Sequence, residues 1–334
     1  MIYNIINRKS GGLNMKNLYV LIGLPGSGKS TYAKTLEGKL FSSDDYREKI
    51  TGDSSDQSAN DKVFKQLYSD IHETMKTGED CIFDATNCTY KSRTRILELA
   101  LKYKYFTTAI VVYQPIDKCI AWDTLRSRSV GSDVIWKYAK SFQFPQYEEG
   151  FDSIRIVRPD CAQLPYGKAT MEFLSHQLFD VLKPQLDTFE QHNPYHTLTV
   201  GKHSDVIVDQ ATKDFVSGNI SLNDFAVLLP AGLWHDCGKL YTQTFDENGI
   251  AHYYGHDSVS VLRLLDIYSQ LQENTYSQTT VYKIFFVINN HMKFKDVLNS
   301  EKATKKFINK WGKDNFELMK RFFNYDMNAC KKCI

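Results

Sequence analysis

The segment that predicts the fold of the amino-terminal half is Gly23-Leu24-Pro25-Gly26-Ser27-Gly28-Lys29-Ser30. Its spacing is G-x-x-x-x-G-K-S, in which glycines let backbone N–H groups approach phosphates, the lysine reaches the β and γ phosphates and the serine supplies an oxygen to magnesium. An apolar run at 18–22 precedes this segment, and a helix-compatible stretch at 31–36 follows it. A strand, a phosphate-binding loop and a helix in this order predict a P-loop domain.

Further apolar runs extend this pattern along the chain. Runs at 81–83 and 108–113 alternate with helix-compatible segments around 59–76 and 91–103, and a last strand is expected at 153–157. Short continuous apolar runs are typical of strands buried on both faces of a parallel sheet. We therefore predict an α/β P-loop domain with a parallel sheet flanked by helices. Its nucleotide site, for ATP or another nucleoside triphosphate with Mg²⁺, would consist of Gly23, Pro25, Gly26, Ser27, Gly28, Lys29, Ser30 and Thr31.

Two carboxylates and an arginine follow the next predicted strand, which ends at Phe41. They lie in Ser43-Asp44-Asp45-Tyr46-Arg47, and ligands of open α/β sheets bind at the carboxyl ends of the strands. On one interpretation Ser43 or Asp44 caps a helix. On the other, Asp44 draws the proton from an attacking hydroxyl and Arg47 holds a substrate phosphate. The two roles are compatible.

Three later residues are candidates for completing this site. Asp84, directly after the run at 81–83, would orient magnesium or the acceptor, or is an ordinary aspartate at a strand end. Arg126 and Arg128 lie in the segment 125–131, after a predicted helix. They would close over the transferring phosphate as a lid, since its developing charge needs cationic donors. The alternative for both arginines is a solvated surface position.

Residues from Met15 to about Val157 resemble the kinase module of phage-type polynucleotide 5′-kinases. The resemblance rests on G-x-P-G-S-G-K-S-T in the loop, D-D-Y-R at 44–47, D-x-T-N at 84–87 and an arginine-bearing lid. It implies that Asp44 is the general base and that Arg47 clamps the phosphate 3′ of the acceptor nucleotide. The lid here is less basic than the family's, and Arg126 is its catalytic candidate, with Arg128 as the alternative. Lys29 completes the catalytic set.

The second half of the chain is predicted to be helical. Helical segments are expected at 169–189, 200–216, 222–235, 258–272, 281–290 and, in one or two pieces, 304–331. Eight of the nine histidines fall in this half. Imidazole and carboxylate groups from several helices can coordinate divalent cations and leave positions open for water. The distribution of histidines therefore indicates a metal site in an all-α domain.

The segment Trp234-His235-Asp236-Cys237-Gly238-Lys239 ends an apolar helical run in this half. With His203 before it and His256, His291 and Asp326 after it, the order of residues resembles the HD phosphohydrolase superfamily, including its two-metal members. The resemblance implies a phosphate-hydrolysing domain that uses one or two ions of Mg²⁺ or of a transition metal such as Mn²⁺, Ni²⁺, Co²⁺ or Fe²⁺.

The resemblance also implies a role for each of these residues. The first metal would be held by His203, His235, Asp236 and Asp326, and Asp236 would bridge to a second metal held by His256 and His291. Lys239 would contact the substrate phosphate, and water activated by the metal would attack phosphorus. The stretch 192–203 also resembles the HD part of tRNA nucleotidyltransferases, which points towards RNA termini. The remaining histidines of this half, expected to be structural or surface residues, are His176, His192, His196 and His252.

The expected organisation is a leader at 1–14, a polynucleotide kinase domain at 15–160, a linker at 161–168 and an HD phosphohydrolase domain at 169–334. A kinase joined to an HD domain resembles bifunctional RNA end-healing enzymes, which phosphorylate 5′-hydroxyls and remove 2′,3′-cyclic, 2′- or 3′-phosphates. The expected partners are RNA ends, or DNA ends. The sequence has no K-x-D-G ligase signature, so sealing is expected to fall to a separate ligase.

Two other functions also fit the sequence. The first is a small-molecule kinase for nucleosides joined to an HD nucleotidase, which needs no extended basic groove beside Arg47. The second is a sensor or RNA-binding role for one domain, although both sets of functional residues are complete. A basic segment near the end is either a surface for a nucleic-acid backbone or a solvated helix face; it contains Lys302, Lys305, Lys306, Lys310, Lys313, Lys320 and Arg321.

Composition narrows the class only a little. The 334 residues are 42% hydrophobic, and their net charge of +2 is the difference between 41 basic and 39 acidic residues, which neither requires nor forbids a nucleic-acid partner. The seven cysteines are odd in number and scattered, which favours reduced thiols in a cytoplasm. Cys330 and Cys333 have C-x-x-C spacing without a second pair. No apolar run reaches the ~20 residues of a membrane span.

Overall fold

The computed structural model describes residues 15–331 apart from 55, 57, 127, 160–180, 195 and 269–276. The chain divides into two compact units, Met1–Ile135 with Pro145–Cys161, and Trp136–Phe144 with Ala162–Ile334. The leader expected at 1–14, the linker expected at 161–168, His176 and Cys333 lie outside the described residues. The two units are described separately below.

The first unit alternates strands and helices, as the sequence pattern predicts. Its elements, together with α7, which continues into the second unit, are β1 Asn17–Ile22, α2 Lys29–Ala33, β2 Lys39–Ser42, α3 Ser43–Thr51, α4 Asn60–Thr77, β3 Cys81–Asp84, α5 Tyr90–Tyr103, β4 Phe106–Val112, α6 Ile116–Thr124, α7 Ser132–Ala139, the 3₁₀ helix η1 Tyr147–Glu149 and β5 Ser153–Val157.

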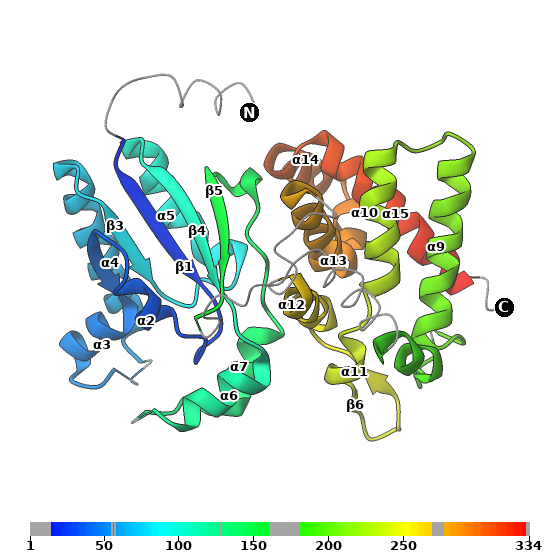
Figure 1. Ribbon diagram of the computed structural model, residues 1–334, viewed down its shortest axis with the longest axis horizontal. Helices are drawn as coiled ribbons and strands as arrows, with labels where there is room; N and C mark the ends of the chain where they lie inside the picture. The colour runs from blue at the N-terminus through cyan, green and yellow to red at the C-terminus, as the bar shows by residue number, and fades with distance from the viewer. Residues whose placement is uncertain are drawn as a thin grey trace, which may run out of the picture. The chain divides into compact units, whose positions relative to one another are not determined.

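The five strands form one parallel sheet in the order β2-β3-β1-β4-β5, flanked by helices (Figure 1). The apolar run of β1 lies at the centre of the sheet because both of its neighbours are buried strands, with Leu21 paired to Asp84 on one side and to Ile110 on the other. Ala33 of α2 packs on Leu21 and Ile110 in a buried apolar cluster. The predicted parallel α/β fold is confirmed, and the central strand ends where the phosphate-binding loop begins.

The loop after β3 supports the start of the phosphate-binding loop. Gly23 N donates to Thr86 O at 3.0 Å, and Asn87 Nδ2 donates to Leu21 O at 2.8 Å. Asn87 has a left-handed backbone with φ of 48°, a conformation that asparagine tolerates better than most residues. The D-x-T-N segment therefore positions the loop through its backbone as well as supplying Asp84.

A buried ion pair links two elements of this unit, α5 and η1. Arg93 Nε and one terminal nitrogen of Arg93 donate to the two oxygens of Glu149 at 2.8 and 2.9 Å, and the other terminal nitrogen donates to Asn87 O at 2.8 Å. The exposed fractions of the Arg93 and Glu149 side chains are 0% and 3%. A two-pronged contact of this kind satisfies both charges away from water, and it ties α5 to η1.

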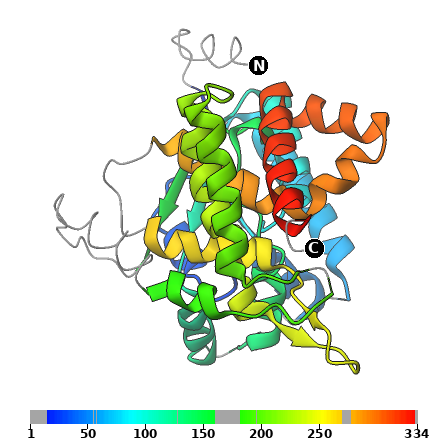
Figure 2. The same ribbon diagram turned by 90° about the vertical axis from the view of Figure 1, so that its right-hand side faces the viewer.

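The second unit is helical, as predicted (Figure 2), and the longest helix among its described residues contacts four others. Residues 181–188 are helical, and the further elements are α9 Val200–Val216, α10 Leu222–Trp234, α11 Lys239–Thr242, β6 Thr244–Phe245, β7 Ala251–His252, α12 His256–Tyr268, α13 Gln278–Leu298, α14 Glu301–Trp311 and α15 Lys313–Lys331. Helix α13 contacts α10, α12, α14 and α15. The short β6–β7 hairpin was not predicted, because two-residue strands carry no alternation that a sequence pattern can reveal.

The second unit also contains a segment from the middle of the chain, Trp136–Phe144. The side-chain amide of Asn289 on α13 accepts from Phe144 N at 2.9 Å and donates to Phe142 O at 3.0 Å. The ring of Phe144 packs on Tyr282 and Phe285, with centroids 4.9 Å from each. One buried amide thus fixes the backbone of this segment on α13.

Replacing Glu149 by alanine should destabilise the first unit by about 3–5 kcal/mol, because the guanidinium of Arg93 would stay buried without its counter-ion. Urea unfolding followed by circular dichroism measures this loss. The matched control is Glu73→Ala, which breaks the exposed ion pair with Lys76 and should leave the unfolding midpoint unchanged. Equal midpoints for the wild type and Glu149→Ala would contradict the structural role of the pair.

Candidate functional sites

The phosphate-binding loop between β1 and α2 needs glycine for steric reasons that the structure makes visible. Gly26 has φ of 78°, and a Cβ there would lie 2.3 Å from Cys119 O. Gly28 has φ of 89° and precedes Lys29, the first residue of α2. A side chain at Gly26 would clash with the backbone of α6, and the left-handed backbone at both positions requires glycine.

The functional residues of the loop meet Asp84 at the end of β3. Lys29 is buried and donates to Leu24 O at 2.8 Å. Burial raises the pKa of the Asp84 carboxyl, while the charge of Lys29 and a hydrogen bond from Ser30 oppose that rise. The structure therefore brings Lys29, Ser30 and Asp84 together, and a hydroxyl beside a carboxylate at this place could hold Mg²⁺ with a triphosphate.

Asp44 and Arg47 lie in the first two turns of α3, where they pair with each other. One terminal nitrogen of Arg47 lies 2.7 Å from Asp44 Oδ1 and 3.2 Å from Ser54 O, and the other donates to Asn60 Oδ1 at 3.1 Å. Arg47 is buried, whereas the Asp44 side chain is 51% exposed. Asp44 is thus accessible, while Arg47 holds the loop after α3. Its role as a phosphate clamp stays a prediction.

The cap of α3 differs from both residues expected from the sequence. The side chain of Ser42 accepts from Asp45 N at 3.3 Å, so Ser42 is the N-cap. The prediction that Ser43 or Asp44 caps the helix is wrong by one residue, because β2 passes directly into α3 without an intervening loop. Asp44 therefore does not cap the helix.

The segment 125–131 is organised by a residue that sequence reasoning missed. The carboxylate of Asp123, which is buried, accepts from Ser129 Oγ at 2.6 Å, from Val130 N at 2.8 Å and from Gly131 N at 3.0 Å. Arg126 lies with a terminal nitrogen 3.8 Å from Asp123, and its side chain is 46% exposed. Arg126 is therefore accessible for a phosphate, whereas Arg128 is half-buried. An aspartate followed by serine and glycine was the available signal, since such side chains accept from nearby backbone N–H groups.

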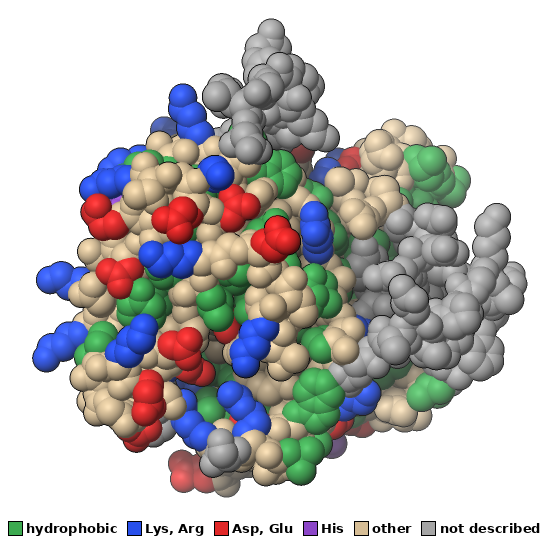
Figure 3. Space-filling model, turned by 60° about the vertical axis from the view of Figure 1, so that its left-hand side comes forward, with side chains coloured by type: hydrophobic (Ala, Val, Ile, Leu, Met, Phe, Trp, Pro, Cys, Tyr) green, Lys and Arg blue, Asp and Glu red, His purple; other side chains and the backbone are tan. Residues whose placement is uncertain are grey.

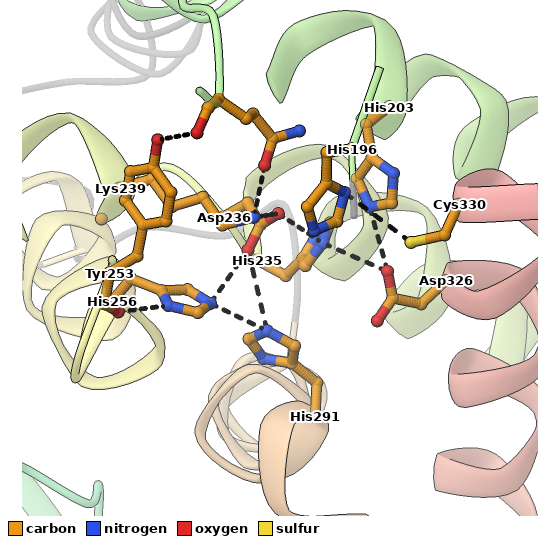
Figure 4. A network of polar contacts seen from close by, with 12 residues as sticks. His196, His203, His235, Asp236, Lys239, Tyr253, His256, His291, Asp326 and Cys330 are labelled. Atoms are coloured by element: carbon orange, nitrogen blue, oxygen red, sulfur yellow. Dashed lines mark hydrogen bonds and ion pairs between the residues drawn. The ribbon is translucent and has the colours of Figure 1, made fainter. Parts of the chain in front are cut away.

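The second site is a buried cluster of histidines and aspartates in the helical unit (Figure 4). Helix α10 ends at Trp234, so His235 is its C-cap and Asp236 lies in the following turn. Asp236 Oδ1 is 3.0 Å from His256 Nε2 and 3.7 Å from His291 Nε2, and Asp236 Oδ2 is 3.3 Å from His235 Nε2. The structure thus gathers residues from the α10–α11 turn, α12 and α13 around one carboxylate.

The other two predicted ligands lie beside this group. His203 Nε2 on α9 is 3.0 Å from Asp326 Oδ1 on α15, and His235 Nε2 is 3.9 Å from the same oxygen. All six residues for which a metal role was predicted in this half are therefore together. Their ligand atoms form two overlapping groups, in which the members lie within 4.8 Å of one another: His203, His235 and Asp326, and His235, Asp236 and His291.

Backbone carbonyls fix how three of these imidazoles face the site. The Nδ1 atoms of His235, His256 and His291 lie 3.0, 2.7 and 2.7 Å from the carbonyl oxygens of Gly232, Tyr253 and Ile288. A carbonyl oxygen only accepts, so each Nδ1 carries the proton and each neutral ring presents the lone pair of Nε2. This arrangement orients metal-ligating histidines in general.

The geometry of the cluster favours a positive charge between two of its imidazoles. His256 Nε2 and His291 Nε2 lie 3.2 Å apart, so two lone pairs face each other beside a carboxylate unless a proton or a cation lies between them. The buried Nε2 of His235 has no hydrogen-bond partner among the described residues. These donors fit one or two divalent cations held by His203, His235, Asp236, Asp326, His256 and His291.

Local charges set the protonation of the cluster. Burial raises the pKa of Asp236, but His235 and Lys239 outweigh burial and hold the pKa well below the usual value. Burial lowers the pKa of His291, but hydrogen bonding and attraction to Asp236 outweigh it, so the pKa is raised above 6.5. Burial, and then the charge of Lys239, lowers the pKa of His196 to about 4. His291 is therefore the imidazole on which a proton substitutes for a cation.

Lys239 is positioned by a residue that the sequence analysis did not select. Its Nζ lies 2.7 Å from Asp236 Oδ2 and donates to Gln191 Oε1 at 2.8 Å. Gln191 is buried, its Nε2 donates to Leu198 O at 3.1 Å, and its backbone oxygen accepts from Tyr253 at 2.6 Å. Because the amide nitrogen is engaged, the amide oxygen must face Lys239. His196, expected at the surface or in a structural role, also lies at the edge of the cluster, with Cys330 beside it.

Comparison with a family model supports the predicted fold of the first unit and does not reach most of the second unit. Residues 18–145 match the family model described as AAA domain, which covers a little over a third of the chain. No match was found among curated protein sequences. Together with the parallel sheet and the loop geometry, the match identifies the amino-terminal part as a P-loop domain.

Three solved structures share low overall similarity with the chain. Two are chains of the Pnkp1/Rnl/Hen1 complex, one of them described as an RNA repair complex, with 24% and 21% identity and TM-scores of 0.31 and 0.35. These alignments cover 36% and 39% of this chain and only 42% and 45% of those chains. The third, a "putative kinase" from Chloroflexus aurantiacus, has 17% identity and a TM-score of 0.38 over 51% of this chain and 99% of its own.

Two further observations on the described residues indicate no particular binding partner. No helix in the described part of the chain is long and apolar enough to cross a membrane. On the face drawn in Figure 3, basic and acidic side chains are interspersed rather than segregated. Interspersed charges are typical of an ordinary solvated surface.

The affinity of the cluster for Mn²⁺ should increase with pH from 6 to 8. Because the pKa of His291 is raised, this imidazole keeps its proton to higher pH than a free imidazole does, and the metal must displace that proton at acidic pH. Each displaced proton should weaken apparent binding about tenfold per pH unit below that pKa.

Isothermal titration in buffers of different ionisation enthalpy measures both the affinity and the number of protons released. His72→Ala, outside the cluster, is the matched control and should behave as the wild type. Affinity that is independent of pH would contradict the proton-for-metal exchange.

Proposed function

We propose that this chain is a two-site enzyme that heals nucleic-acid ends, with RNA as its substrate. A P-loop site that adds a phosphate and a histidine-aspartate site that removes one would both act on the broken strand. The observation that carries the proposal is the coexistence in one chain of a phosphate-binding loop with an accessible carboxylate and a cluster of six histidine and aspartate side chains, five of them buried.

In the P-loop site the chain's own residues supply binding and proton transfer. The loop amides and Lys29 hold the triphosphate, and Ser30 with Asp84 provides oxygen ligands for Mg²⁺. Asp44 accepts the proton of an attacking 5′-hydroxyl, and Arg126 approaches the transferring phosphoryl group from the lid. Arg47 lies 2.7 Å from Asp44 Oδ1, which holds the carboxylate in place to accept that proton.

In the cluster, one or two divalent cations would polarise a phosphoryl oxygen and lower the pKa of a water. The six residues named above would hold these cations, and their Nδ1–H contacts keep the imidazoles oriented. Two of the three N–H groups of Lys239 are directed to Asp236 and Gln191, which leaves the third for a substrate phosphate oxygen. The products expected are a free 2′,3′-diol and inorganic phosphate, and a separate ligase would then seal the healed ends.

One RNA oligonucleotide tests both halves of the proposal. It carries a 5′-hydroxyl and a 2′,3′-cyclic phosphate, and it is incubated with the protein, ATP, Mg²⁺ and Mn²⁺ before both ends are read by mass. Gain of a 5′-phosphate together with loss of the 3′-terminal phosphate is the expected result. If both ends stay unchanged while free nucleosides or nucleotides are turned over, a small-molecule kinase joined to a nucleotidase replaces the proposal.

Single substitutions should separate the two activities. Lys29→Ala or Asp44→Ala should abolish 5′-phosphorylation and spare 3′-end hydrolysis, because the residues lie in the first unit. His235→Ala or Asp236→Ala should do the reverse. Mass analysis of both ends of the same oligonucleotide measures each activity, and circular dichroism checks folding. A folded single variant that loses both activities would contradict two independent sites.

The amide of Gln191 should support the rate of 3′-end hydrolysis, although Gln191 is not one of the predicted metal ligands. Gln191→Leu removes the acceptor of Lys239, and loss of a hydrogen bond to a charged group should lower kcat/KM for 3′-end hydrolysis roughly 10- to 100-fold. The same variant should retain 5′-phosphorylation. Gln185→Leu, at an exposed position, is the matched control. Unchanged hydrolysis in Gln191→Leu would show that Lys239 needs no such support.

A further inference from the structure

A second group of side chains with metal-ligand atoms lies at the edge of the cluster, and of its members only His203 belongs to the predicted ligand set. It consists of His196 before α9, His203 on α9 and Cys330 near the end of α15, and the ligand atoms of the three lie within 4.8 Å of one another. Figure 4 shows His196 and Cys330 on the side of Asp326, away from His256 and His291. The three residues come from distant parts of the chain, and His196 and Cys330 are 134 positions apart in the sequence.

The distance between two of these ligand atoms is close to the distance between two ligands of a tetrahedral cation. Cys330 Sγ lies 3.7 Å from His196 Nδ1. A zinc ion with bonds of about 2.3 Å to sulfur and about 2.0 Å to nitrogen places those two atoms roughly 3.5 Å apart at the tetrahedral angle. The rings of His196 and His203 are nearly perpendicular, at 85°, with centroids 5.5 Å apart. Little movement is therefore needed for the three ligand atoms to converge on one ion.

The chemistry of the donors separates this set from the rest of the cluster. The six ligands considered above are imidazoles and carboxylates, which suit Mg²⁺ and Mn²⁺ as well as harder transition metals. A thiolate with two imidazoles selects borderline and soft cations and disfavours Mg²⁺. His203 is buried and belongs to both sets, whereas His196 and Cys330 are only half-buried and can receive an ion from solvent.

We propose that His196, His203 and Cys330 form a binding site for a divalent cation of the Zn²⁺ class, adjoining the histidine-aspartate cluster. The site requires neither of the two activities proposed above, because it is defined by its donors. A cation there draws on His203, so it also competes with the cluster for one imidazole.

Cobalt(II) is the probe that distinguishes this site, because thiolate coordination gives Co²⁺ an intense charge-transfer absorption in the near ultraviolet that imidazole and carboxylate ligands do not give. The full-length wild type, reduced and freed of metal, is titrated with Co²⁺. The expected result is a charge-transfer band that saturates, is abolished by Zn²⁺ and survives a tenfold excess of Mg²⁺.

Four variants assign the band. Cys330→Ser and His196→Ala should each lose it, with at least a tenfold loss of intensity, while His256→Ala, which alters only the other side of the cluster, should retain it. Cys330→His should bind Zn²⁺ but show no band, since it keeps a ligand and removes the sulfur. Circular dichroism confirms that each variant folds.

Two results would overturn the proposal. One is the absence of a thiolate band in the wild type, which would leave Cys330 outside any cation site. The other is a band that persists in Cys330→Ser or in His196→Ala, since six other cysteines remain in the chain and one of them would then be the ligand.

Discussion

The cluster of the helical unit is arranged around one buried carboxylate, that of Asp236, whose burial costs free energy that its neighbours must offset. Asp236 is only 3% exposed, and an isolated buried charge is far too costly to tolerate. Its oxygens are surrounded by Lys239 and by the imidazoles of His235, His256 and His291, and backbone carbonyl groups orient those imidazoles in turn. The same side chains that let the fold tolerate Asp236 are donors of the metal site that we propose.

The P-loop unit uses a related device with different parts. Asp84 is a buried carboxylate at the end of a central strand, opposed by Lys29 and Ser30, and the start of the loop that carries those two residues is held by the backbone of Thr86 and the side chain of Asn87. In both units backbone carbonyl groups fix the direction of functional side chains, as Leu24 O does for Lys29 and Ile288 O for His291.

The sequence predicted those parts of the molecule in which a local pattern and a distant contact agree. Apolar runs separated by glycine-rich segments predicted the parallel sheet. The resemblance to the HD superfamily named six candidate metal ligands that the structure brings together, and their metal-binding role stays a prediction. Gln191 and Cys330 were missed because their positions depend on contacts across the fold: an amide acceptor for a lysine 48 positions away, and a thiol beside a histidine 134 positions away. Asp123 was missed although its signal is local, since it accepts from backbone N–H groups of residues that closely follow it. Ser42 was missed for a local reason, since no loop residue marks the change from strand to helix.

The placement of Trp136–Phe144 in the helical unit has a consequence for synthesis on the ribosome. Phe144 obtains its hydrogen-bond acceptor from Asn289, 145 positions later. At 5–20 residues per second, roughly 7 to 30 seconds pass before that residue has even been made. During this interval Phe142 and Phe144 have no helix to cover them, although β5 can already join the sheet. The nascent chain therefore carries an exposed aromatic segment between two finished parts of its first domain, the kind of site that chaperones bind.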